Sequence, residues 1–168
     1  MRIGLNAGHT LSGPGFGTSG KLIESVETRR ICSRLTEMFK SCGVEVIPCT
    51  VDKAVTQKAY LNKVTEMANR IDLDWFISIH LNNDAKKAGH GVEVHTYKGR
   101  QYQDAVEVCE HIAALGFTNR GVKDGSKLHV VNKTKAKAML IEVCFVNDPD
   151  ASMYKDKFEQ ICEAIVYA

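Results

Sequence analysis

Apolar residues along the chain recur with two different periods. Short apolar or alternating runs predict β-strands, whereas apolar residues three or four positions apart predict amphipathic helices. The runs predict six strands, at about residues 2–6, 44–48, 74–80, 91–96, 127–131 and 138–145. The helical spacing predicts four helices, at about residues 23–42, 56–70 and 102–116, and from 148 to the end of the chain.

The order of these elements predicts the class of fold. Helices that alternate with strands favour a mostly parallel sheet with helices on both faces. The strands on either side of the third helix allow one antiparallel member. We therefore expect a single α/β domain over residues 1–168, with a six-stranded, mostly parallel mixed sheet; 168 residues suit one compact core.

Composition excludes several classes of protein. The net charge of +2 gives no nucleic-acid footprint. No apolar run is long enough to span a bilayer, and no signal peptide is visible, so we expect synthesis in the cytoplasm. The cysteines form no C-x-x-C pair and are expected to be buried free thiols; they are Cys32, Cys42, Cys49, Cys109, Cys144 and Cys162.

Three potential metal ligands stand at ends of predicted elements. His9 follows the first strand, Glu24 opens the first helix, and His80 ends the third strand. In this topology the three positions can converge at one edge of the sheet. Two imidazoles and a carboxylate with an open fourth position suit a catalytic Zn²⁺, which activates a water molecule. Each of these histidines, taken singly, is more often a structural residue, so the residues alone leave the site a hypothesis.

Glu142 is an acidic residue inside the most apolar predicted strand. A carboxylate buried there without a partner costs several kcal/mol, and a nearby metal or metal-bound water would be such a partner. Such a carboxylate could act as a general base. The alternative is a structural carboxylate that accepts from backbone amides or pairs with a lysine.

Other polar residues offer weaker candidates. Glu27, one helical turn after Glu24, is the alternative ligand, although a solvated helix residue is its expected role. Glu93 and His95 share a strand face. They could form a metal pair, and a polar outer face of the strand explains them as well. His129, in the predicted fifth strand, is expected to border the cleft. A solvated turn is expected to hold Lys133, Lys135 and Lys137.

Taken in order, several segments carry a family resemblance. They are residues 3–9, Glu24 with its helix, 78–82, 91–94, 120–123 and 140–151. With them the chain resembles the zinc-dependent N-acetylmuramoyl-L-alanine amidases of the amidase_3 type, found in phage endolysins, sporulation enzymes and autolysins. Asn6 stands where the family usually has Asp, Thr10 and Cys144 stand where it has Gly, and an arginine after the second strand is missing. These departures concern loop shape and substrate contacts.

The resemblance implies a site and a reaction. It implies that His9, Glu24 and His80 bind one Zn²⁺ and that Glu142 is the catalytic carboxylate. The reaction would be hydrolysis, by zinc-activated water, of the amide that joins N-acetylmuramic acid to the L-alanine of the stem peptide. We expect Asn82 and His129 to contact the substrate.

Two other functions stay open at this point. A zinc peptidase that acts on wall or free peptides would share the chemistry, and a non-catalytic wall-binding domain could share the fold. The expected partner of the domain is bacterial peptidoglycan, reached after phage lysis or export. A separate wall-binding module, common in the family, is not visible in this sequence.

Overall fold

A computed structural model describes residues 1–86 and 88–168. Six strands form one mixed sheet in the order β2-β1-β3-β6-β4-β5. Their bounds are β1 Arg2–Ala7, β2 Glu45–Pro48, β3 Trp75–Asn82, β4 Val92–Thr96, β5 Asn119–Asp124 and β6 Lys137–Phe145. The α/β fold with a six-stranded sheet is as expected from the sequence.

Strand direction also follows the prediction. Strands β2, β1, β3 and β6 pair in parallel, β4 is antiparallel to β6, and β5 is parallel to β4. The registers place His80 opposite Glu142, and Glu142 opposite Glu93. Paired residues point to the same face of a sheet. One row across three strands therefore carries three ionisable side chains.

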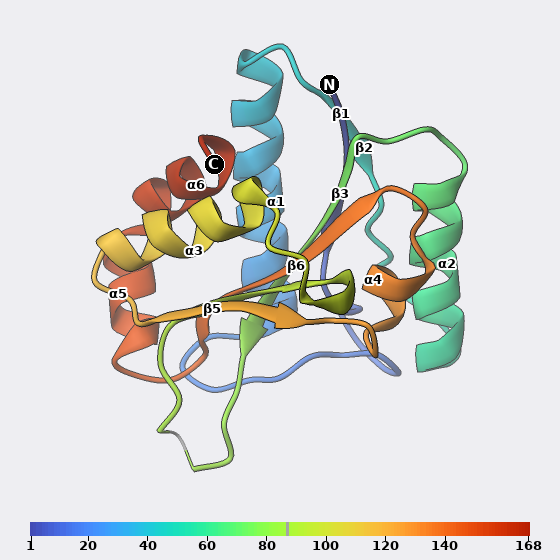
Figure 1. The fold of residues 1–168 in the computed structure, drawn as a ribbon. Coiled ribbons are helices and arrows are strands. Elements are labelled where there is room, and N and C mark those ends of the chain that lie inside the picture. The colour runs from blue at the N-terminus through green and yellow to red at the C-terminus, as the bar shows by residue number, and fades with distance from the viewer. Residues whose placement is uncertain (87) are drawn as a thin grey trace.

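Helices cover both faces of the sheet (Figure 1). One face packs on four helices: α1 Glu24–Ser41, α3 Gln103–Ala114, α5 Asp150–Asp156 and α6 Phe158–Val166. The other face packs on α2 Gln57–Asn69 and α4 His129–Lys133. Each face has its own buried apolar cluster. No helix in the described part of the chain has the length and apolar composition needed to cross a membrane.

Local sequence explains where the main helices begin and end. Ile31 and Leu35 of α1 are fully buried against the sheet, and Gly43 just after the helix adopts φ +75°, which favours glycine. The α2 helix begins after Thr56, whose side chain accepts a hydrogen bond from the backbone N–H of Ala59. Glu24 lies in the first turn of α1, where the helix dipole favours a carboxylate.

The predicted fifth strand and last helix are wrong. Residues 127–131 do not form a strand: the buried Val130 and Val131 lie in α4 and pack into the apolar cluster under α2. The fifth strand is instead Asn119–Asp124, an edge strand that pairs only with β4 and stays largely accessible, so it lacks an apolar alternation. The last helix is broken at Lys157 into α5 and α6.

Candidate active site

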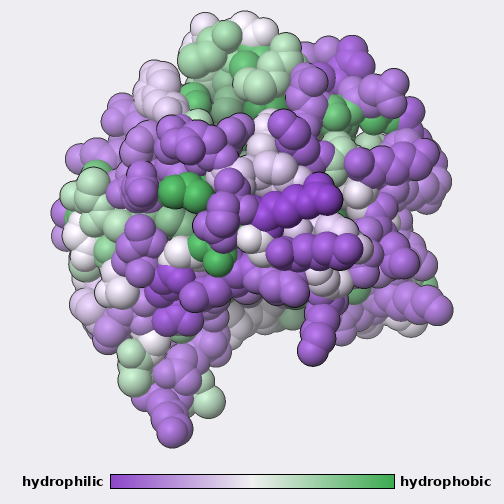
Figure 2. All heavy atoms as spheres, in the orientation of Figure 1, coloured by the Kyte–Doolittle hydropathy of each residue, from purple (hydrophilic) through white to green (hydrophobic). Residues whose placement is uncertain are grey.

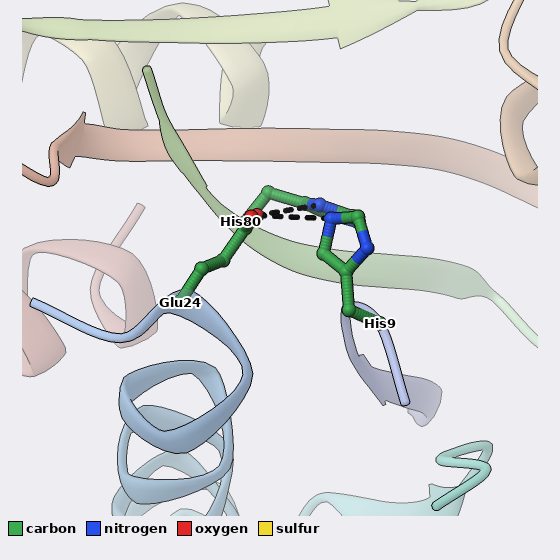
Figure 3. Close-up of side chains that lie close together, drawn as sticks. All are labelled: His9, Glu24 and His80. Atoms are coloured by element: carbon green, nitrogen blue, oxygen red, sulfur yellow. Dashed lines mark hydrogen bonds and ion pairs between the residues drawn. The ribbon is translucent and has the colours of Figure 1, made fainter. Parts of the chain in front are cut away.

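His9, Glu24 and His80 lie together at the carboxyl edge of the parallel strands. They come from the loop after β1, the first turn of α1 and the end of β3, and one ligand atom of each lies within 4.8 Å of the others. Glu24 Oε1 lies 3.1 Å from His9 Nε2 and 3.1 Å from His80 Nδ1 (Figure 3). The three positions that the sequence places at element ends therefore do converge in space.

This group of atoms fits a four-coordinate metal ion. Ligands at 2.0–2.1 Å from a tetrahedral Zn²⁺ stand about 3.3 Å apart, close to the spacing of Glu24 Oε1 from each imidazole. Two imidazoles and a carboxylate are also the donor set of catalytic zinc sites. We conclude that these residues can hold a metal ion.

Protonation of the three groups is set by burial and by their mutual contacts. Burial would raise the pKa of Glu24, but the close approach of the His80 and His9 rings lowers it well below its usual range. Burial lowers the pKa of His80, with Glu24 opposing, and so favours its neutral form. At His9 burial acts in the same sense, but Glu24 outweighs it and raises the pKa. Glu24 is therefore a ready anionic ligand, and His80 a ready neutral one.

Hydrogen bonds behind the site fix which ring nitrogen faces Glu24. His9 Nδ1 lies 2.9 Å from the carbonyl oxygen of Gly15, which can only accept, so Nδ1 carries the proton and Nε2 is left for a metal. His80 Nε2 lies 3.1 Å from Ser78 Oγ, whose hydroxyl donates to Asn6 Oδ1 at 2.7 Å. Ser78 thus accepts from His80 Nε2–H, and Nδ1 is left for a metal.

Backbone amides hold the Glu24 carboxylate in place. Thr18 N–H donates to Oε2 at 2.9 Å, and Leu81 N–H donates to Oε1 at 3.1 Å. Each oxygen thus has one amide donor, and the side chain is 4% exposed. These bonds orient the carboxylate without using the second lone pair of either oxygen.

Arg29 of α1 supports the backbone at His9. His9 adopts φ +67°, a left-handed conformation that costs of order 1–3 kcal/mol outside glycine. Arg29 Nη2 donates to the His9 carbonyl oxygen at 2.9 Å, and its Nε donates to Asp52 Oδ1 at 2.9 Å. Thr28 Oγ1 donates to the carbonyl oxygen of Gly8 at 3.2 Å. The first helix therefore supplies both Glu24 and the side chains that hold the backbone at His9.

Two glycines leave room for the site's side chains. A Cβ at Gly8 would lie 2.6 Å from His80 Nε2, and a Cβ at Gly17 would lie 2.7 Å from His9 Cδ2 and collide with Glu24 Oε2. Sequence reasoning did not assign these positions. The glycine-rich composition of residues 12–20 is a signal for Gly17 alone, and it does not reveal that this glycine packs on His9 and Glu24; nothing in the local sequence marks Gly8.

Glu142 lies next to this group in the same row of the sheet. It pairs with His80 across β3 and β6, and its Oε2 is buried without a hydrogen-bond partner among the described residues. Burial, with the negative charges of Glu24 and Glu93 adding to it, raises the pKa of Glu142 to about 8. An orphaned carboxylate beside a metal-binding group is the arrangement expected of a general base, because a bound cation would draw it back to the ionised form.

Glu93 forms a buried ion-pair cluster and not a metal pair. It is 8% exposed, accepts from Arg120 Nε at 2.8 Å and from Asn82 Nδ2 at 2.9 Å, and has His95 Nε2 at 3.4 Å. The expectation of a polar outer face at these residues is wrong, because the Arg120 and Asn82 side chains contact Glu93 and leave it buried. Asn82 lies beside the row that carries Glu142, and its contact with substrate stays a prediction.

Glu27 and His129 lie in other surroundings than expected. Glu27 is not a solvated residue: it accepts a hydrogen bond from the hydroxyl of the buried Tyr154 at 2.8 Å. His129 opens α4, not a strand, and its Nε2 lies 3.5 Å from Thr65 Oγ1 of α2. Neither belongs to the metal-binding group of the described residues. The substrate contact expected of His129 stays a prediction.

Comparison with known proteins finds both a matching family model and solved structures with the same fold. Residues 3–168 match the family model Amidase_3, described as N-acetylmuramoyl-L-alanine amidase. The chain belongs to this family. The Amidase_3 assignment agrees with the solved catalytic domain of the CD27L endolysin targeting Clostridia Difficile, to which this chain is 27% identical, with a TM-score of 0.91 over 99% of this chain and 94% of that one.

Curated relatives of this chain extend beyond the matched region. An uncharacterized protein of Clostridium perfringens is 29% identical over 164 residues, 94% of this chain and 48% of its own length. The sporulation-specific N-acetylmuramoyl-L-alanine amidase of Bacillus subtilis is 29% identical over 152 residues, 88% of this chain and 57% of its own length. The chain spans about half the length of the first of these relatives.

Proposed function

We propose that this domain is a zinc-dependent N-acetylmuramoyl-L-alanine amidase. It would hydrolyse the amide between the lactyl group of N-acetylmuramic acid and the L-alanine of the stem peptide in bacterial peptidoglycan. The observation that carries the proposal is the unpartnered Glu142 beside His9, Glu24 and His80. Membership of Amidase_3 supplies the substrate class.

The ligands of the proposed Zn²⁺ are His9 Nε2, His80 Nδ1 and Glu24 Oε1. Zinc held there would acidify a water molecule and polarise the lactyl carbonyl. The hydrogen bonds to Gly15, Ser78, Thr18 and Leu81 hold these ligand atoms toward one point before the ion arrives.

Glu142 would move the proton. As the water oxygen adds to the lactyl carbonyl carbon, the Glu142 carboxylate accepts the proton that this oxygen loses. The protonated carboxyl then donates the proton to the alanine nitrogen as the carbon–nitrogen bond breaks. The products are a free lactyl carboxylate and a peptide with a free amino terminus. General acid–base catalysis of this kind contributes about 10²–10⁴-fold.

Substrate contacts and the site of action complete the proposal. Asn82 and His129 remain the proposed substrate contacts, and the domain would act on the cell wall after phage lysis or export, with a wall-binding module elsewhere in the protein. A peptidase on wall or free peptides would use the same four residues, so the geometry does not favour it over the amidase. A non-catalytic binding domain would have no need of an orphaned Glu142 beside three ligands.

The decisive experiment is mass spectrometry of purified cell wall after digestion. An amidase releases stem peptides that begin with free L-alanine and leaves intact glycan strands. Cleavage between two amino acids would show a peptidase, and an unchanged wall would favour the binding domain. Metal analysis of the same sample should give one zinc per chain; zinc bound through cysteines would refute the ligand set.

A further inference from the structure

A groove of about 270 Å³ lies far from the metal ligands along the sheet. One wall is the segment from Tyr97 to Tyr102, which includes the 3₁₀ helix η1 (Tyr97–Gly99); the other wall is the connection from α4 to β6. In the view of Figures 1 and 2, hydrophilic side chains gather over this middle part of the surface, between the start of α3 and α4.

The groove carries positive charge without a counter-charge. Arg100, Lys135 and Lys137 line it and are exposed, and none of its described lining residues is acidic. Within residues 1–86 and 88–168, none of these three cations has a carboxylate within 4.0 Å. Every other arginine of the chain does have such a partner: Arg2, Arg29, Arg30, Arg34, Arg70 and Arg120.

Arg100 is instead held by an aromatic side chain. Its Nη1 donates to the Tyr102 hydroxyl at 3.1 Å, which leaves most of the guanidinium donors unused. The Nζ of Lys137 lies 5.8 Å from the centre of the Tyr102 ring and 5.6 Å from that of Trp75. The groove thus combines exposed cations with aromatic surface.

Uncharged hydrogen-bonding groups complete the lining. Asn132 is exposed on it, and Thr134 is 9% exposed with an Oγ1 that has no partner in the described part of the chain. A phosphate ligand with hydroxyl groups would contact both sets of side chains. Its phosphate oxygens would accept from the cations, and its hydroxyl groups would hydrogen-bond to Asn132 and Thr134.

The groove is separate from the proposed catalytic residues. Lys137 begins β6, and Glu142 lies five residues further along the same strand, a span of about 16 Å at 3.3 Å per residue. The Tyr97–Tyr102 segment follows β4, which runs antiparallel to β6 and so ends near the start of β6. A ligand in the groove would leave the metal-binding edge free.

We propose that this groove binds a polyol-phosphate polymer, in which phosphodiesters join short hydroxylated units, of the kind attached to cell walls. The inference rests on the proposed function only in placing the domain at the wall. Charge complementarity favours this occupant: three unpaired cations match repeated phosphates. An anionic membrane fits less well, since Tyr97 is the one large exposed apolar residue among the described residues that line this groove.

Binding is tested with purified poly(glycerol phosphate), which the proposed reaction does not consume. The chain has one tryptophan, Trp75, and Lys137 lies over its ring, so intrinsic fluorescence should report binding. The test variant is Arg100→Ser with Lys135→Ser and Lys137→Ser. The matched control removes the same charge elsewhere, by Lys40→Ser, Lys63→Ser and Lys155→Ser, all exposed positions. A second variant with Lys135→Ser and Lys137→Ser alone keeps the Arg100–Tyr102 bond.

We expect only the groove variants to lose affinity for the polymer. Removing three exposed positive charges together should weaken polymer binding about tenfold, and the control should change it less than about twofold. Added salt should weaken binding by the wild type. Equal affinity of the wild type and both groove variants would overturn the proposal. Inorganic phosphate binding as tightly as the polymer would reduce the groove to a small-anion site and also overturn it.

Two further measurements distinguish the polymer site from a membrane site and from the catalytic residues. Vesicles containing phosphatidylglycerol should bind the groove variants and the wild type alike; a loss with vesicles but not with polymer would indicate a membrane site and refute the proposal. Cleavage of a soluble muramoyl peptide should be the same for the wild type, the groove variants and the control. Failure of the wild type to cleave this peptide would refute the proposed function, whereas the measured polymer binding would still test the groove.

Discussion

Glu142 and Glu93 lie directly opposite each other on β6 and β4, yet their environments push their pKa values in opposite directions. His95 and Arg120 lower the pKa of Glu93 to about 2, although burial opposes them. Burial, helped by two neighbouring carboxylates, raises the pKa of Glu142 to about 8. A pair of carboxyl groups separated in this way is typical of sites in which one stays charged and the other exchanges a proton. Glu93 therefore has a structural role, and Glu142 is the proposed proton carrier.

Replacing Glu142 by Gln should abolish most turnover while keeping the fold and the zinc. Glutamine keeps the shape of the side chain but cannot accept a proton from water, so wall hydrolysis should fall about 10²–10⁴-fold. The measurement is hydrolysis of purified wall, with zinc content determined on the same sample. Near-normal activity at full zinc occupancy would exclude the catalytic role, and loss of zinc together with activity would make Glu142 a ligand or support.

Glu93 should make the fold sensitive to acid. Its pKa is about 2 when folded and near 4.5 when unfolded, so the unfolded chain binds the extra proton between these values and stability falls as pH falls through that window. Urea unfolding should therefore show the wild type more stable than Glu93→Gln at about pH 6, with the difference shrinking by about pH 3. A difference that stays constant over this range would contradict the assigned ion pairs.

His80→Ala and Glu27→Gln should separate the metal ligand from its helical neighbour. Removing His80 takes away one of three protein ligands, so zinc and lytic activity should both be lost. Gln at position 27 can still accept the Tyr154 hydroxyl, so zinc and activity should persist, and stability should fall by no more than about 1 kcal/mol. Metal analysis and thermal unfolding of both variants test this, and equal metal loss from both would mean that Glu27 is a ligand.

Gly17→Ala should weaken metal binding without unfolding the domain. The added methyl group would meet His9 and Glu24, whose side chains can shift, and not a backbone atom. Zinc affinity, measured by competition with a chelator, should fall at least about tenfold, since ligand positions set by supporting contacts typically matter by 10–100-fold. Ser19→Ala, in the same loop, is the control and should bind zinc normally.

Sequence patterns predicted the parts of this structure that are strongly apolar or that carry ligands. β3 and β6 are buried central strands. Their apolar runs, one ending in His80 and the other containing Glu142, predict strands at these places. The apolar pattern does not predict β5, because an edge strand with one neighbour buries little apolar surface. Its Arg120 side chain donates a hydrogen bond to Glu93 and does not pack in the core. The supporting bonds of Ser78, Gly15 and Arg29 could not be predicted, because they depend on register and loop closure that no local pattern encodes.

The central position of β6 has a consequence for synthesis of the protein. The three proposed metal ligands lie in the first half of this chain, whereas Glu142 is synthesised only with β6, which must insert between β3 and β4 to complete the sheet. A nascent chain would therefore present all its proposed zinc ligands before its proposed proton carrier is synthesised. An enzyme directed at the wall of the cell that makes it would in this way stay inert until β6 has been synthesised and paired.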